Sequence, residues 1–154
     1  MGILSFLLGK SNKQSAIKIQ IRMRAEEFVV TYGERYKGLD YSQQSLVVID
    51  RLLSEYTNDW KDMSIESQSE LLTNASSYIL WIAHQQYNGN FYWSEQYLQP
   101  VLVIGEPDYR IAFMLQDKIH NYIEKKDDQK ISLLYRKIAE EQQRAIKDSN
   151  ILIR

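Results

Sequence analysis

Hydrophobic residues recur at intervals of three and four through the first half of the chain, which predicts helices. Ile17, Ile21 and Phe28 follow this spacing and predict a first helix from about Ser15 to Tyr36. Residues 17–24 also alternate strictly between apolar and polar side chains, so a strand over this stretch remains an alternative.

A second helix is predicted from Asp40 to Asn58. Leu46, Ile49 and Leu53 line up on one side of it, and Asp40 or Ser42 can cap its first turn. The polar residues that close the segment place Trp60 in the following loop.

The third helical segment is the most apolar part of the chain, and we expect the fold to be organised around it. It begins near Ser64 and ends at Asn88-Gly89, two residues that tolerate positive φ. Between Glu70 and Glu106 only Glu95 carries a charge, and burying an unpaired charge is costly, so this charge-free stretch predicts the core. The expected core residues are Leu71, Tyr78, Ile79 and Ile82.

Three short segments after this helix predict a small sheet. Residues 91–93 are aromatic, residues 101–104 are mostly β-branched, and residues 109–113 return after a Gly-Glu-Pro-Asp turn. This order predicts a three-stranded antiparallel meander. Strand alternation places Phe91 and Trp93 on one side of it and Tyr92 on the other.

Two further helices are predicted C-terminal to the meander. Their apolar faces lie within residues 115–123 and 131–145, and residues 124–130 form a solvated link. The apolar tail 151–153 is expected to dock on the fold. The fold class is therefore α+β, with helices packed on a small antiparallel sheet.

Composition limits the organisation of the chain and its partners. Its 154 residues suit a single α+β domain over residues 15–154, preceded by an apolar and basic arm, residues 1–14, that can be flexible. A net charge of −1, with no Lys or Arg in residues 71–105, argues against nucleic-acid binding. The absence of cysteine excludes disulfides and thiol chemistry and fits a cytoplasmic protein.

The N-terminal residues allow a second location. Apolar residues between Ile3 and Leu8 precede the basic residues of a segment that extends to residue 24, a pattern that could touch a membrane surface. Phe6 stands where the myristoylation pattern requires Ser or Thr. We favour a docked or frayed terminus over membrane contact.

One ordered set of short motifs resembles a known group of proteins. The motifs are Leu39-Asp40-Tyr41-Ser42, Asn88-Gly89-Asn90-Phe91-Tyr92-Trp93 and Gln99-Pro100-Val101-Leu102-Val103-Ile104-Gly105-Glu106-Pro107. Over roughly residues 25–125 the chain resembles small bacterial cytosolic proteins that share an α+β domain of unknown function. The resemblance implies a helix pair packed on a short sheet and supplies no catalytic residues.

Candidate chemistry is sparse. His84 lies on the central helix, and His120 follows Asp117 at a spacing that lets the carboxylate orient its ring. No metal-ligand spacing, phosphate-binding glycine loop or nucleophile elbow is present, so we expect no catalytic residues, no metal and no cofactor.

Two functions remain as hypotheses. The favoured one is a non-enzymatic protein-interaction module of the adaptor or toxin-immunity type, which binds a protein partner or itself through surplus aromatic residues. The alternative is a small-ligand-binding protein or enzyme with a pocket between the central helix and the sheet, lined by Trp81, His84, Tyr92 and Trp93. The full set of binding candidates is Trp81, His84, Tyr92, Trp93, Tyr97 and Tyr109.

Overall fold

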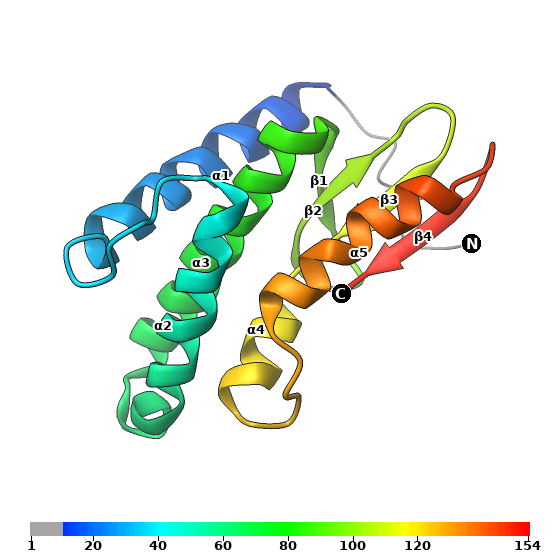
Figure 1. Cartoon of the computed structure of the whole chain (residues 1–154). Helices are drawn as coiled ribbons and strands as arrows, with labels where there is room; N and C mark the ends of the chain where they lie inside the picture. Colours follow the sequence, from blue (N-terminus) through cyan, green and yellow to red (C-terminus); the bar gives the residue numbers. More distant parts are fainter. Residues whose placement is uncertain (1–10) are drawn as a thin grey trace.

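A computed structural model describes residues 11–154, which form an α+β fold of five α-helices and a four-stranded mixed sheet (Figure 1). Short 3-10 helices at Gln43–Ser45 and Trp60–Asp62 flank the second α-helix. The main elements in chain order are α1 (Ser11–Tyr32), α2 (Leu46–Asp59), α3 (Ile65–Tyr87), β1 (Asn90–Ser94), β2 (Gln99–Ile104), β3 (Arg110–Phe113), α4 (Gln116–Ile123), α5 (Ile131–Arg144) and β4 (Asn150–Ile153).

Helix α3 is the centre of the core, as predicted. Leu71, Tyr78, Ile79 and Ile82 are all buried, and α1 packs along the helix over much of its length. The Tyr78 ring lies 5.3 Å from that of Phe28 on α1. Its hydroxyl donates to Ser45 Oγ at 2.8 Å and accepts from the backbone N–H of Tyr41 at 3.0 Å, so one side chain joins α3 to α1 and to the start of α2.

Helix α1 is helical throughout, so the strand alternative for residues 17–24 is wrong. The alternation misleads because α1 has apolar residues on two opposite sides. Ile21 faces α3 and is buried, whereas Ile19 and Met23 are exposed. The helix begins at Ser11, so residues 11–14 of the expected N-terminal arm are helical, and residues 1–10 of that arm lie outside the described part of the chain.

The residues at the two ends of α3 begin and end the helix as the sequence predicts. Ser64 caps its N-terminus and accepts from the backbone N–H of Ser67 at 3.1 Å. Asn88 and Gly89 both have positive φ, 60° and 97°, and end the helix. A Cβ at Gly89 would lie 2.5 Å from the backbone oxygen of Val103, so the turn into β1 also needs glycine for close approach to β2.

The sheet has the order β1-β2-β3-β4, which corrects the prediction of three strands. Strands β1, β2 and β3 form the expected antiparallel meander. Residues 151–153, expected only to dock, form β4, which pairs parallel to β3 with Ile111 opposite Ile151. Helices α4 and α5 therefore form the crossover connection between the parallel strands β3 and β4.

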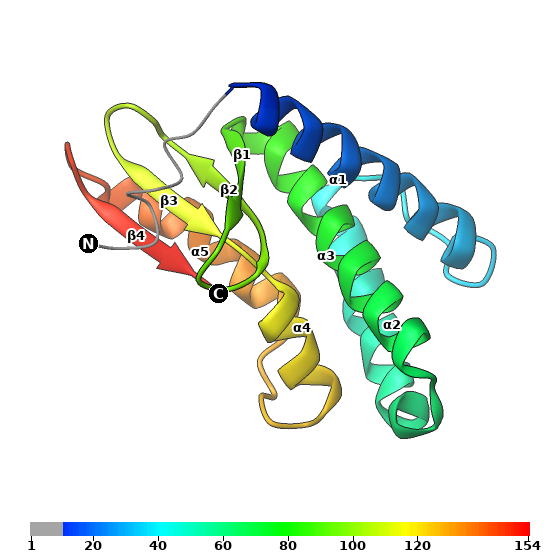
Figure 2. The same ribbon diagram turned by 180° about the vertical axis from the view of Figure 1, so that it is seen from behind.

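The two faces of the sheet have different surroundings. The inner face carries Phe91, Leu102 and Phe113, which join the helices in the main core, and α5 runs across this side (Figure 1). The outer face carries a separate apolar cluster around Val101 and Met114. Seen from that side, no helix of residues 11–154 lies over the strands (Figure 2).

Among residues 11–154, no helix combines the length and the apolar character that crossing a bilayer would require.

Replacement of Ile79 by Ala tests the central position of α3. Ile79 is fully buried, so the lost burial and the cavity should reduce the free energy of unfolding by ~2–5 kcal/mol. The matched control is Ile65→Ala in the first turn of the same helix, where the side chain is exposed and the change should stay within ~0.5 kcal/mol. Urea denaturation measures both, and equal losses would show that α3 is not central.

Candidate functional site

The predicted aromatic residues of the sheet do not form one exposed face. Tyr92 is only 7% exposed, whereas Trp93 on the same strand is 42% exposed. Tyr97 and Tyr109 are half-buried, and the Tyr109 ring covers Gly105 so closely that a side chain at Gly105 would clash with it. Phe91 faces the helices as expected, but Trp93 does not join it in the core because β1 is the edge strand.

Tyr92 is held by a polar group at one end of the outer sheet face. Its hydroxyl donates to Glu106 Oε1 at 2.8 Å, and Arg110 Nε donates to Glu106 Oε2 at 3.4 Å. Burial raises the pKa of Tyr92 to about 12, and the hydrogen bond to Glu106 adds to the effect. Glu106, assigned from the sequence to turn geometry alone, therefore also anchors this side chain.

A second polar group lies at the opposite end of the outer face. The Arg154 guanidinium sits 4.4 Å from the centre of the Tyr97 ring, a cation–π distance, and 3.7 Å from Asp117 Oδ2. Gln99, which is buried, accepts a hydrogen bond from the backbone N–H of Gln116 at 3.0 Å. This group ties β2 and β4 to the start of α4.

His84 packs between two aromatic rings, both tilted against its own, on the inner side of the sheet. Its ring lies 5.4 Å from that of Trp81 and 5.0 Å from that of Phe91. Its Nδ1 is buried and has no hydrogen-bond partner within the described part of the chain. Burial lowers the pKa of His84, and the positive charge of Lys18 lowers it further.

The four residues expected to line one pocket divide between the two sides of β1. Trp81 and His84 pack against Phe91, whereas Tyr92 leaves the strand on the opposite face and belongs to the outer cluster. Trp93, at the sheet edge, is 42% exposed. The fold therefore brings Trp81 and His84 together, whereas Tyr92 lies on the other face of β1.

His120 has partners other than the expected Asp117. Its Nε2 lies 3.2 Å from Glu124 Oε1, and its ring meets Trp60 edge-on at 5.8 Å. Asp117 instead faces Arg154. Within residues 11–154, no three His, Asp or Glu side chains gather where they could hold a metal ion.

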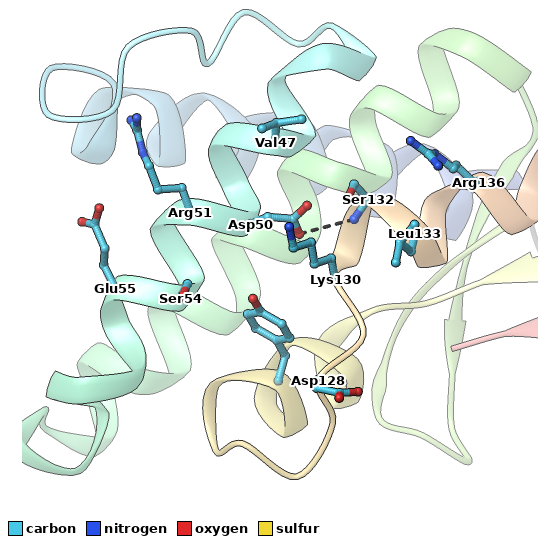
Figure 3. Close-up of a pocket in the computed structure, with 11 residues that line it drawn as sticks. Val47, Asp50, Arg51, Ser54, Glu55, Asp128, Lys130, Ser132, Leu133 and Arg136 are labelled. Atoms are coloured by element: carbon cyan, nitrogen blue, oxygen red, sulfur yellow. Dashed lines mark hydrogen bonds between the residues drawn. The ribbon is translucent and has the colours of Figure 1, made fainter.

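A hollow of about 700 Å³ lies between α2, the loop after α4, and α5 (Figure 3). Asp50 on α2 lies at its inner wall and accepts hydrogen bonds from the backbone N–H groups of Ile131 and Ser132, at 2.8 Å and 3.4 Å. This carboxylate therefore caps α5 from a neighbouring helix. The hollow is lined by both signs of charge, from residues that include Arg51, Glu55, Asp128, Lys130 and Arg136.

One exposed apolar surface was not predicted from the sequence. Ile19, Met23 and Val30 on α1 are 61%, 64% and 82% exposed. At 100° per residue these three positions fall on one side of the helix, opposite the side that packs on α3. In the sequence, this helix contains apolar residues on two of its sides. Together they produce the strict alternation of residues 17–24, which also fits a strand.

Comparison of the chain with protein-family models, with curated proteins and with solved structures finds no match. The resemblance to small bacterial cytosolic proteins therefore stays a prediction, and the function is inferred from the geometry alone.

Replacement of Asp50 tests its role as a cap. Asp50→Ala leaves two backbone donors of α5 without their acceptor, and the free energy of unfolding should fall by ~1–3 kcal/mol. Asp59→Ala, at an exposed position in the same helix, is the control and should change stability by less than ~0.5 kcal/mol. If both variants melt like the parent protein in a thermal scan, Asp50 is not a cap.

The lowered pKa of His84 predicts a pH dependence of stability. Because the folded state holds His84 at a pKa below its unfolded value of ~6.5, the unfolded state binds more protons in this range. The free energy of unfolding should therefore fall as the pH drops through ~6.5, and a His84→Gln variant should show a smaller fall. Denaturant titrations at several pH values between neutrality and mild acid measure both slopes; identical slopes would contradict the assignment.

Proposed function

We propose that this protein is a non-enzymatic protein-interaction module whose binding surface is the outer side of α1. The observation that carries the proposal is the set of exposed apolar side chains of Ile19, Met23 and Val30, which share one side of α1 with Glu26. The opposite side of the same helix, with Ile21 and Phe28, is already buried against α3. A surface helix ordinarily has one apolar side, so a second one points to a second packing partner.

The position of α1 suits this role. The helix runs along the periphery of the molecule, with α3 beside it and α2 beyond α3 (Figure 2). Its 22 residues offer ~33 Å of continuous helix to a partner. Another amphipathic helix could lie along it without rearrangement of the core.

Charge along α1 favours a particular partner. Lys13 and Lys18 lie in the first half of the helix, which has no acidic residue, whereas Glu26 and Glu27 lie in the second half together with Arg22 and Arg24. Two such helices packed antiparallel place Lys13 and Lys18 of each near Glu26 and Glu27 of the other. A second copy of the chain meets this requirement, and the resulting contact is two-fold and closed. The module is therefore proposed to self-associate through α1, as a dimeric adaptor would.

The contacts made by the titratable residues agree with a non-enzymatic role. Asp50 caps α5, Glu106 holds Tyr92, and His120 pairs with Glu124. Each of these groups is engaged in a contact within the fold. The alternative function of a ligand-binding pocket lined by Trp81, His84, Tyr92 and Trp93 has no comparable support, because these side chains divide between two faces of β1.

Sedimentation of the full chain tests the proposal. The parent protein should form a concentration-dependent dimer with a Kd on the order of micromolar, because each copy contributes only a few apolar side chains. Met23→Glu introduces a charge into the contact and should raise the Kd by at least about tenfold.

The matched control is Gln20→Glu, which adds the same charge on the flank of the same helix and should change the Kd by less than about threefold. Thermal melts of all three proteins verify that folding is unchanged. A monomer at every accessible concentration, or equal effects of the two substitutions, would overturn the assignment of this surface.

A further inference from the structure

The outer face of the sheet is packed as an interior, although it faces away from the helices. Apolar side chains from β1, β2 and the end of β3 meet there, and those at its centre are between 0% and 1% exposed. The residues are Tyr92, Val101, Val103, Ala112 and Met114, and Leu152 of β4, opposite Ala112 and 38% exposed, lies at the rim. An apolar sheet face of this extent is rarely left to solvent in a monomer, so something must cover it.

The helices of residues 11–154 do not provide the cover. They pack on the opposite face and beside the edge of β1, and none crosses the strands on the outer side (Figure 2). The charged groups of this face are confined to its ends, with Glu106 and Arg110 at one and Arg154 at the other. Between them lies an uninterrupted apolar strip.

The chain enters α1 beside this strip. Ser11 begins the helix, α1 contacts β1, and the side chain of Gln14 lies near enough to Tyr92 to lower its pKa against the opposing effect of burial. The segment that precedes Ser11 is MGILSFLLGK, in which five of residues 3–8 are apolar and none is charged. Ten extended residues can span ~33 Å, more than the ~15 Å across four strands.

We propose that residues 3–8 of this chain dock on the outer sheet face and form its missing layer. The composition matches the surface, since an apolar segment meets an apolar strip, and its attachment at Ser11 keeps it close to the strip at all times. The two surfaces proposed for this protein are thus different in kind. The outer side of α1 receives a second copy, whereas the sheet receives the chain's own N-terminal segment.

A spin label placed at the rim of the face tests the proposal in the full chain. The chain has no cysteine, so Asn150→Cys, exposed at the start of β4, accepts a single nitroxide. Backbone N–H signals of residues 3–8 should be broadened beyond detection by this label. The matched control is Asn58→Cys, exposed at the far end of α2, whose label should leave those signals sharp.

Samples that mix spin-labelled chains with isotope-enriched chains identify what covers the outer face. Broadening within one molecule supports the proposal. Broadening seen only when labelled and isotope-enriched molecules are different chains would assign the face to a second copy and overturn it. Sharp signals from both labelled proteins, with broadening only after addition of anionic phospholipid vesicles, would assign the segment to a membrane and also overturn it.

A variant of the segment gives an independent readout. Replacement of Ile3, Leu4, Phe6, Leu7 and Leu8 by Ser should lower the melting temperature by more than about 5 °C and increase binding of a hydrophobic dye, because the outer face loses its cover. The control, Ser5→Thr with Lys10→Gln, should leave both unchanged. A melting temperature equal to that of the parent protein would contradict docking. Neither the melting temperature nor the dye binding of this variant tests the α1 surface. Both results therefore bear on docking whether or not the chain dimerises.

Discussion

The burial of α3 is the constraint on which the other elements depend. From Leu71 to Ala83 the helix has ten buried residues and no charged side chain that could face water. Helix α1 therefore packs along it, and α4 and β2 also contact it. The cost of burying polar atoms is met locally, since the Tyr78 hydroxyl is bonded to both Ser45 and Tyr41.

Sequence pattern was sufficient for the elements that depend on short-range periodicity. The helices, the antiparallel meander and the turn at Asn88-Gly89 all follow from spacing and from residues that tolerate positive φ. It was not sufficient for β4, because a four-residue segment that pairs parallel across two helices leaves no local turn signal. The continuous apolar run of β2, from Val101 to Ile104, did contain a signal that both faces of the sheet are buried.

The candidate site was harder to predict than the fold, and for a physical reason. Aromatic and ionisable residues are equally suited to binding and to holding a structure together, and their type does not say which they do. Tyr92 and Glu106 hold one end of the sheet, and Trp81 packs against His84. The surfaces open to partners are instead marked by ordinary aliphatic residues such as Ile19 and Val30, which become informative only when the packing of the opposite side is known.

The parallel pairing of β3 with β4 has a consequence for how the chain folds. Strand β3 can join β2 as soon as the meander forms, but its other edge finds a partner only after α4 and α5 have folded and closed a loop of more than thirty residues, from Phe113 to Asn150. Until then the N–H and C=O groups on that edge are unpaired, and another chain could pair with them. The interval before β4 arrives is thus the period in which intermolecular strand pairing competes with folding, and pulse-labelled hydrogen exchange would register it as late protection of the amides that β3 and β4 share.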